Sequence, residues 1–538
     1  MKRNYLFFIG IMCCVTLFAK QKDEILLTIE DEKISKSEYK YIYEKNNSDN
    51  VFDKKTPEEY LDLYVNFKLK VREAIAREIN TTQTFYNELA EYRKQFAEAY
   101  LTDLQKESEI MQEAYNRLKE DVEVSHILIR VPNNASPADT LAAYKKAQET
   151  IKRLEIEDFA LVAQEISEDM SVRENKGHIG YITGFWAVYP FETAAYNTPA
   201  GKLAPIIRTQ FGYHIIKVHN RRPARGEVLT AHIMKMAQDS LAFAEKKEAI
   251  DSLYQQLMAG ADFETLAKEK SEDFYSAQQG GKLAWFGISR MPIEFENEAF
   301  ALKNTGDISA PFQTKFGWHI VKLLDKKGVP SFEEKRAEIK RRISLDERAA
   351  IIENSFVDKL KNEYKFSLDK KALDEIHNLA KTTQNDTLFR EKVAKLNKPL
   401  FKYADKIVLQ TELSSPELDL YNVDSQLKKL VNKKLIACED SRLESKYPEF
   451  RSQVQEYHDG ILMFEISNRE VWEKAIEDKE GLEKFFEKNK ENYSAENYED
   501  IRGIITSDYQ NYLEEEWIKA LRAKYKITVN KAVLQSIK

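Results

Sequence analysis

The sequence predicts an α+β protein of several domains, in which two copies of one helix-and-strand unit interrupt a mainly helical chain. At 538 residues the chain is too long for a single hydrophobic core. A stretch at 314–322, TKFGWHIVK, nearly repeats an earlier stretch at 209–217, TQFGYHIIK. Outside these copies, apolar residues recur at spacings of three and four, which is typical of amphipathic helices.

Composition narrows the class of protein. Hydrophobic residues make up 43% of the chain, charged residues make up 32%, and the formal net charge is −7. These values are typical of a globular protein and give no basic face for nucleic acid.

The first nineteen residues differ from the rest. Lys2 and Arg3 precede an apolar run over 5–18 that is too short to span a bilayer comfortably. This pattern predicts a secretory signal peptide at 1–19, with an uncleaved anchor as the alternative. No other long apolar run follows, so we expect no transmembrane segment in the mature chain.

Cysteine usage agrees with export. Cys13 and Cys14 lie inside the signal segment, but Met12 is larger than the residue that a lipoprotein signal places before its cysteine, which makes lipidation the minor alternative. Removing the signal leaves Cys438 alone, which excludes an internal disulfide framework.

Residues 20–121 are expected to form a helical region. The segment 25–35 predicts a small hairpin. Thr56, followed by Pro57 and Glu59, predicts the start of a helix with a capping box. Further helical patterns run over about 85–105 and 110–119.

Two α+β units follow, at 122–223 and 228–328. Each opens with an alternating strand that carries a histidine, His126 or His232. Helices, a Ser-Glu-Asp end, a glycine turn and the closing Phe-Gly-aromatic-His strand then come in the same order in both. The closing strands carry His214 and His319.

This set of motifs resembles the parvulin-type peptidyl-prolyl isomerases, and two such units in tandem behind a secretory signal are similar to the SurA-type periplasmic chaperones. In the second copy the resemblance implies a central histidine pair, an aspartate where some relatives have cysteine, two walls of a proline pocket and a supporting hydroxyl. These are His232, His319, Asp273, Met291, Phe295 and Thr314.

The first copy implies His126, Asp169 and His214 as catalytic residues, with Phe191 and Thr209 in the substrate pocket. Ala187 stands where the second copy has methionine. A shallower pocket holds a proline ring less well, so we expect the second copy to be the stronger enzyme.

The reaction needs no cofactor. An X-Pro bond exchanges cis and trans slowly because of its partial double bond, and a catalyst has to stabilise the twisted amide. Neutral imidazoles serve equally well in a purely structural hydrogen bond, so that alternative stays open for both histidine pairs. A metal site is not expected, because neither copy offers a third clustered histidine or cysteine.

Beyond the second copy we expect residues 329–379 to complete the first helical core, with a strand near Phe366 pairing with the hairpin near Ile25. Residues 380–396 are polar and predict a linker. Residues 397–538 predict a second core-like unit, because 517–529 echoes 356–368. Chance similarity between two charged amphipathic helices is the alternative.

Together these features predict a periplasmic peptidyl-prolyl isomerase and chaperone. The expected partners are unfolded polypeptides with X-Pro bonds, outer-membrane proteins among them, and not nucleic acid. A peptide-binding holdase with degenerate parvulin domains is the alternative function, and an adaptor without clients is a third.

Overall fold

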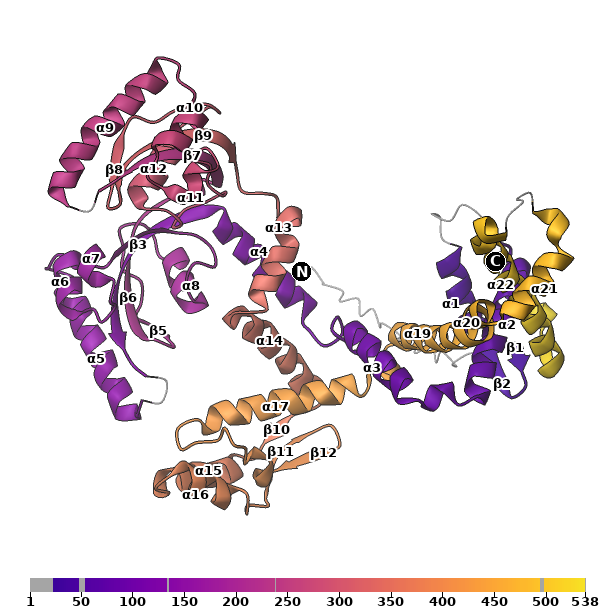
Figure 1. The fold of residues 1–538 in the computed structure, drawn as a ribbon. Coiled ribbons are helices and arrows are strands. Elements are labelled where there is room, and N and C mark those ends of the chain that lie inside the picture. Colours follow the sequence, from indigo (N-terminus) through magenta and orange to yellow (C-terminus); the bar gives the residue numbers. More distant parts are fainter. Residues whose placement is uncertain (1–22, 48–53, 133–134, 238, 494–497, 538) are drawn as a thin grey trace, which may run out of the picture. The chain divides into compact units, whose positions relative to one another are not determined.

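The computed structural model describes residues 23–47, 54–132, 135–237, 239–493 and 498–537 (Figure 1). The expected signal peptide at 1–19 lies outside these residues. Within them, no helix combines the length and apolar character needed to cross a membrane. The chain divides into two compact units, one formed by residues 1–100 with 440–538 and the other by residues 101–439.

The first unit contains a three-stranded antiparallel sheet of order β13-β1-β2. Its strands are β1 (Ile25–Ile29), β2 (Glu32–Ser35) and β13 (Ile527–Val529). Its helices are α1 (Lys36–Asn46), α2 (Pro57–Ala76), α3 (Gln83–Ala97), α18 (Leu443–Lys446), α19 (Pro448–Ser467), α20 (Glu473–Glu477), α21 (Lys479–Lys488), α22 (Tyr498–Lys524) and α23 (Lys531–Gln535).

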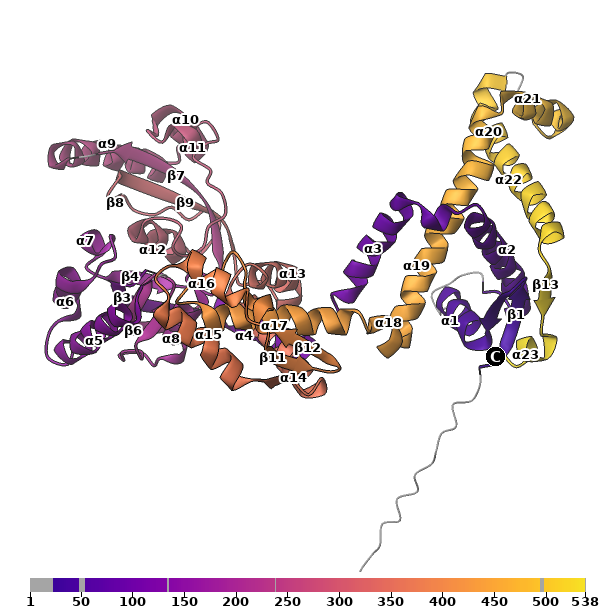
Figure 2. The same cartoon turned by 90° about the horizontal axis from the view of Figure 1, so that it is seen from below.

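Helix α2 starts at the expected capping box. Thr56 Oγ1 accepts the N–H of Glu59 at 3.2 Å, and the Glu59 carboxylate accepts the N–H of Thr56 at 2.8 Å. The apolar face of α2 packs on β1 and on Leu521 of α22. Helix α2 also lies beside α19, as Figure 2 shows. Helix packing and the sheet therefore share one core.

The second unit contains both α+β domains. The first domain has a sheet of order β4-β3-β6-β5. Helix α4 (Leu104–Leu118) leads into it, and its elements are β3 (Glu120–Arg130), α5 (Pro137–Arg153), α6 (Phe159–Ile166), α7 (Val172–Asn175), β4 (His178–Ile182), α8 (Tyr189–Asn197), β5 (Ile207–Thr209) and β6 (Gly212–Pro223).

The second domain repeats this plan with a sheet of order β7-β9-β8, and residues 282–286 bridge to β7 in the place of β4. Its elements are β7 (Glu227–Met236), α9 (Ser240–Met258), α10 (Phe263–Lys270), α11 (Phe274–Ala277), α12 (Ile293–Ala301), β8 (Phe312–Thr314) and β9 (Gly317–Lys327). The predicted α+β class with small antiparallel sheets is confirmed.

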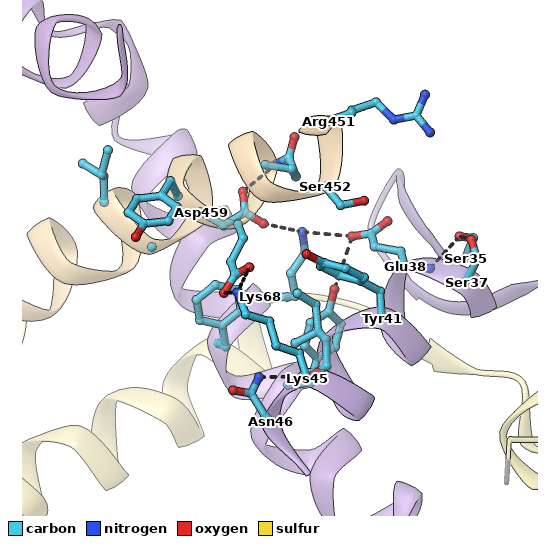
Figure 3. Close-up of a pocket in the computed structure, with 18 of the residues that line it drawn as sticks. Ser35, Ser37, Glu38, Tyr41, Lys45, Asn46, Lys68, Arg451, Ser452 and Asp459 are labelled. Atoms are coloured by element: carbon cyan, nitrogen blue, oxygen red, sulfur yellow. Dashed lines mark hydrogen bonds and ion pairs between the residues drawn. The ribbon is translucent and has the colours of Figure 1, made fainter. Parts of the chain in front are cut away.

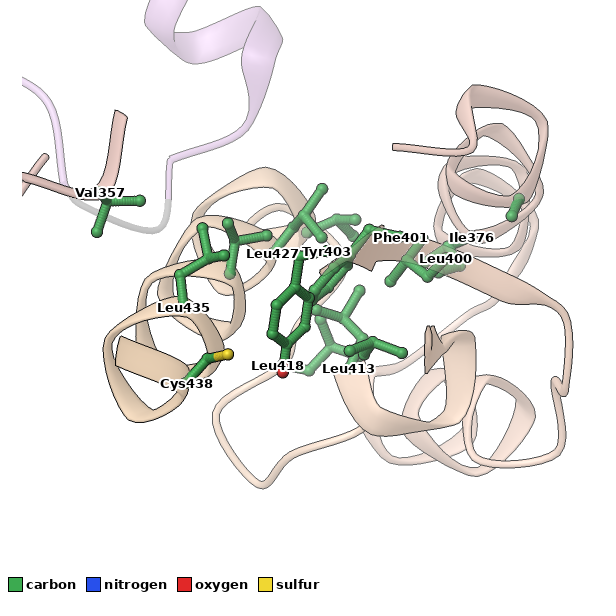
Figure 4. Packing of buried hydrophobic residues seen from close by; sticks show 14 of the residues in the cluster. Val357, Ile376, Leu400, Phe401, Tyr403, Leu413, Leu418, Leu427, Leu435 and Cys438 are labelled. Atoms are coloured by element: carbon green, nitrogen blue, oxygen red, sulfur yellow. The ribbon is translucent and has the colours of Figure 1, made fainter. Parts of the chain in front are cut away.

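The rest of the second unit is a helical region around a further hairpin. It consists of α13 (Phe332–Ile343), α14 (Glu347–Glu363), β10 (Ser367–Leu368), α15 (Lys370–Thr382), α16 (Asp386–Val393), β11 (Pro399–Tyr403), β12 (Lys406–Leu409) and α17 (Val423–Asp440). Figure 4 shows its core, in which Phe401 and Tyr403 of β11 pack near Leu427 and Leu435 of α17.

One predicted strand pairing is wrong. The strand after Phe366, β10, pairs with β11, whereas the hairpin near Ile25 takes the last strand of the chain, β13. Residues 329–379 therefore do not complete the N-terminal core, and residues 397–538 do not form one second core. Residues 356–368 and 517–529 are similar in sequence, so the sequence was compatible with either β10 or β13 pairing with the hairpin near Ile25. Closing β10 on β11 needs a much shorter loop than closing it on β1, and shorter loops lose less entropy.

Two helical segments also differ from prediction. The expected linker at 380–396 contains α16, because Asn385 caps its start by accepting the N–H of Leu388 at 2.9 Å. The helix expected over 85–105 ends at Ala97. Asp103 then starts α4 by accepting the N–H of Lys106 at 3.1 Å.

The strand pairing gives a matched pair of substitutions. Thr528 faces Thr28 in the first unit, and Ser367 faces Lys402 in the second. Thr528→Pro should speed hydrogen exchange of the Thr28 amide by about tenfold, because proline removes a ladder hydrogen bond between β13 and β1, at a cost of about 1 kcal/mol. Ser367→Pro should instead speed exchange at Lys402. Faster exchange at Thr28 in Ser367→Pro would contradict the observed topology.

Candidate functional site

Each α+β domain brings two histidines to one face of its sheet. In the second domain, His232 of β7 stands opposite Val321, and His319 of β9 stands opposite Met234. Side chains alternate across a strand, so this register places both imidazoles on the face covered by α12. Their rings are parallel, 15° apart, with centroids separated by 5.7 Å.

Two glycines let the backbone come close enough to hold this pair. Gly281 has a φ of +80°, and a Cβ there would lie 2.3 Å from the carbonyl oxygen of His232. Gly317, two residues before His319, has a φ of +139° and would place a Cβ 2.1 Å from the carbonyl oxygen of Lys235. Only glycine fits these positions, which explains its place in the repeated motif.

Two separate sets of hydrogen bonds fix the two rings. Asp273 Oδ2 lies 2.7 Å from His232 Nε2, and Ser276 Oγ lies 2.9 Å from the same nitrogen. Ser276 also donates to Asp273 Oδ2 at 2.6 Å. At the other end, Thr314 Oγ1 lies 2.9 Å from His319 Nε2.

The partners of the two rings differ. Thr314 Oγ1 accepts the N–H of Phe316 at 3.1 Å and also lies within hydrogen-bonding distance of His319 Nε2. His232 donates from Nε2 to the carboxylate of Asp273, which makes its Nδ1 an acceptor. Both Nδ1 atoms are buried and have no hydrogen-bond partner within the described part of the chain.

Burial keeps the rings neutral. Burial, and then the neighbouring imidazole of His232, lower the pKa of His319 to about 4. Burial also lowers the pKa of His232, although the carboxylate of Asp273 acts in the opposite direction. For Asp273 itself, burial opposes ionisation, but hydrogen bonds from Ser276 and His232 outweigh it and lower the pKa.

An apolar seat lies against the histidine pair. Phe295 of α12 is 1% exposed and meets both rings edge to face, with centroids 5.6 Å from His232 and 5.5 Å from His319. Phe312 stacks on His319 at 5.6 Å. Met291 belongs to the same cluster, and it and Phe312 both stay half-buried, so solvent reaches the seat at these two side chains.

The first domain contains the same arrangement. His126 and His214 have centroids 5.7 Å apart, and their Nδ1 atoms lie 3.5 Å from each other. Asp169 Oδ2 lies 2.7 Å from His126 Nε2, and Thr209 Oγ1 lies 2.8 Å from His214 Nε2. Phe191 meets both rings edge to face. Burial, and then the imidazole of His126, lower the pKa of His214 to about 4.

The seat of the first domain is smaller. Ala187 occupies the position of Met291, and Ile207 of β5 occupies the position of Phe312. The hydroxyl of Ser276 is also missing, because its counterpart is Val172. Methionine and phenylalanine offer more apolar contact area than alanine and isoleucine do.

A buried ion cluster fixes the first domain to neighbouring helices. Glu192 of α8 is fully buried and accepts hydrogen bonds from Arg117 of α4 at 3.0 Å and from Arg348 of α14. It also accepts the N–H of Phe185 at 2.7 Å. Its counterpart Glu296 accepts backbone N–H groups instead, among them those of Arg290 at 2.8 Å and Met291 at 3.1 Å.

All eleven site residues expected from the sequence thus fall into two clusters, and several others were missed. Ser276 lies three residues after Asp273, the spacing of one helical turn, and that spacing was the available signal. Phe312 stands two residues before Thr314 on β8, so strand alternation places the two on one face. No local pattern marks Glu192, because its partners lie far away in the sequence.

Comparisons with known proteins agree with this geometry. Residues 110–222 and 232–325 match family models described as PPIC-type PPIASE domain. Proteins named Chaperone SurA are similar over part of the chain. That of Methylobacillus flagellatus is 32% identical over 245 residues, 44% of this chain and 55% of the relative. That of Nitrosococcus oceani is 34% identical over 217 residues, 39% and 50% respectively.

The chain therefore spans about half the length of the curated relatives it matches. Among solved structures, the peptidylprolyl isomerase PrsA from Bacillus anthracis is 33% identical, covers 22% of this chain and 51% of its own, and has a TM-score of 0.19.

Because the paired histidines are buried and neutral, we expect them to gain a proton only at low pH. We expect His319 and His214 to take up protons with pKa values of about 4, whereas the same histidines in urea-unfolded chain should titrate near about 6.5. A folded pKa below the unfolded one means that the unfolded state binds more protons as pH falls. Stability contributed by these groups is therefore complete above about pH 6.5 and is lost as pH falls toward 4.

Imidazole resonances in a nitrogen-15 NMR titration measure these values directly. Charging of either ring between pH 6 and 7 in the folded chain would contradict a neutral, buried pair.

Proposed function

We propose that this chain, whose two α+β domains belong to the PPIC-type PPIASE family, is a peptidyl-prolyl cis-trans isomerase and chaperone that assists the folding of exported and outer-membrane proteins in the periplasm. The observation that carries the proposal is the neutral histidine pair set against a partly open apolar seat at Met291. The signal pattern at 1–19 and the similarity to proteins named Chaperone SurA support export and a chaperone role.

The residues act on the amide rather than on a covalent intermediate. Rotation about an X-Pro bond has a barrier of about 18–20 kcal/mol, because the planar amide is stabilised by resonance. An apolar seat of Met291, Phe295 and Phe312 holds the pyrrolidine ring while the preceding carbonyl turns. A dry pocket favours the twisted amide, since the planar form is the more polar one.

The hydrogen bonds that hold the two rings then set the polarity around the rotating carbonyl. Asp273 stays ionised and orients His232, and Thr314 orients His319, so no ring has to turn during the reaction. Nucleophilic attack is not part of this scheme, because an aspartate stands where a thiol would be needed. These side chains position the peptide and supply fixed dipoles. Neither of these two contributions requires a cofactor.

The second domain is proposed to be the stronger enzyme. Its seat has Met291 and Phe312 where the first domain has Ala187 and Ile207, and only its aspartate is bridged to the histidine by a serine hydroxyl. The first domain, fixed by Glu192 to the helices beside it, is proposed to contribute mainly peptide binding.

A substitution at the open part of the seat tests the isomerase proposal. Met291→Ala should lower kcat/KM for an X-Pro peptide about tenfold in a protease-coupled assay, because the lost contacts with the proline ring are worth about 1–2 kcal/mol. Met258→Ala is the matched control. The side chain of Met258 is 52% exposed and lies at the end of α9, the helix that covers the opposite face of the sheet. Its loss should leave turnover unchanged.

Wild-type turnover no faster than the uncatalysed reaction would end the isomerase proposal. The alternative, a holdase whose parvulin domains only bind peptide, keeps the histidine pairs as structural hydrogen bonds. Suppression of aggregation of an unfolded β-barrel protein, without isomerase turnover, would support that alternative.

A further inference from the structure

A cavity in the first unit has no role in the isomerase chemistry. Its volume is about 1570 Å³, and residues of α1, α2, α3 and α19 line it (Figure 3). Sites for small molecules usually measure about 300–1,000 Å³. This cavity is larger than that range and has room for several residues of an extended polypeptide.

Aromatic side chains form much of the cavity wall. The lining includes Tyr41, Tyr60, Tyr64, Phe67, Tyr92, Tyr457 and Phe464. Phe464 is 58% exposed, and the neighbouring Leu63 and Tyr457 are also exposed. Large apolar surfaces left open to solvent in this way mark sites that a partner covers.

The charge of the lining selects the partner. Eight carboxylates line the cavity, against three cationic side chains. Of the cations, Lys45 lies 2.6 Å from Glu456 and is thus already neutralised. Arg451 is exposed, and Figure 3 shows its guanidinium group pointing away from the Lys68 cluster. The cavity therefore presents an excess of negative charge.

At the base of the cavity one lysine forms ion pairs with three carboxylates. Lys68 is 2% exposed, and its Nζ lies 2.6 Å from Glu32, 2.9 Å from Asp459 and 3.9 Å from Glu38. Glu38 is the most distant and receives a hydrogen bond from Tyr64 at 3.2 Å. Burial raises the pKa of Glu38, as expected for a carboxylate whose charge is incompletely balanced.

We propose that this cavity binds extended segments of unfolded polypeptide in which a lysine or arginine stands beside an aromatic residue. The cationic side chain lies against Glu38 and the neighbouring carboxylates, and the aromatic ring packs on Phe464 and the tyrosines. This inference rests on the proposed function, because such segments would belong to unfolded clients. A cation beside aromatic faces gains further attraction.

Binding of short peptides to the full chain tests the inference. The probe is a fluorescent eight-residue peptide of alternating lysine and tyrosine, without proline, and its matched peptides replace lysine by glutamate or tyrosine by alanine. We expect the lysine-tyrosine peptide to bind at least about tenfold more tightly than either, with binding that weakens as salt rises.

Substitutions locate the site. Glu38→Gln removes one charge while keeping an acceptor for Tyr64, and Phe464→Ala removes an exposed ring; each should weaken binding about fivefold to tenfold. Glu480→Gln, an exposed carboxylate, and Tyr421→Ala, an exposed ring, lie outside the cavity lining; they are the matched controls and should bind like wild type. Circular dichroism checks that each variant folds. If Glu38→Gln does not fold, the affinity of Phe464→Ala tests the inference instead.

Equal binding of the glutamate and lysine peptides would overturn the inference, as would unchanged affinity in Phe464→Ala. Isomerase turnover on an Ala-Pro peptide, measured on the same preparations, separates the two proposals. Turnover without selective peptide binding means that the cavity inference alone fails. Selective binding without turnover means that the isomerase proposal fails while the cavity remains a polypeptide site.

Discussion

The antiparallel pairing of the opening and closing strands is the constraint on which each α+β domain depends. In the second domain it puts His232 opposite Val321 and His319 opposite Met234, so the two imidazoles meet on one face. A slip of one residue would turn one histidine toward the helices on the opposite face. Gly317 allows the close strand contact that maintains this register, which ties a three-residue motif to the geometry of the whole site.

Two domains with this shared framework differ in what surrounds it. The second surrounds its histidines with Phe295, Phe312 and a half-buried methionine, whereas the first has smaller side chains at two of the three positions. Conversely, the first domain is fixed by a fully buried carboxylate that two arginines approach. Removing one partner from such a cluster would leave a buried charge unpaired, which is strongly destabilising. The two copies thus share one framework but differ in the size of the apolar seat and in how the domain is attached to neighbouring helices.

The sequence could predict whatever is encoded within a short stretch. Each closing motif holds a glycine, a histidine and a threonine within a few residues, and the resemblance implied the other two histidines, both aspartates and both phenylalanines, which the structure brings into the same two clusters. Long-range choices could not be predicted in the same way. The strands after Phe366 and after Lys526 have nearly the same pattern, so local residues do not decide which hairpin each strand joins. Chain connectivity decides it, through the cost of closing a loop.

Exchange NMR on an Ala-Pro peptide, with the full chain added in catalytic amounts, tests the central claim most directly. The account predicts cis-trans exchange cross-peaks that grow with protein concentration, together with chemical-shift changes at Met291 and His319 that are larger than those at Ala187 and His214. Exchange no faster than in free peptide, or shift changes absent from both histidine pairs, would contradict it.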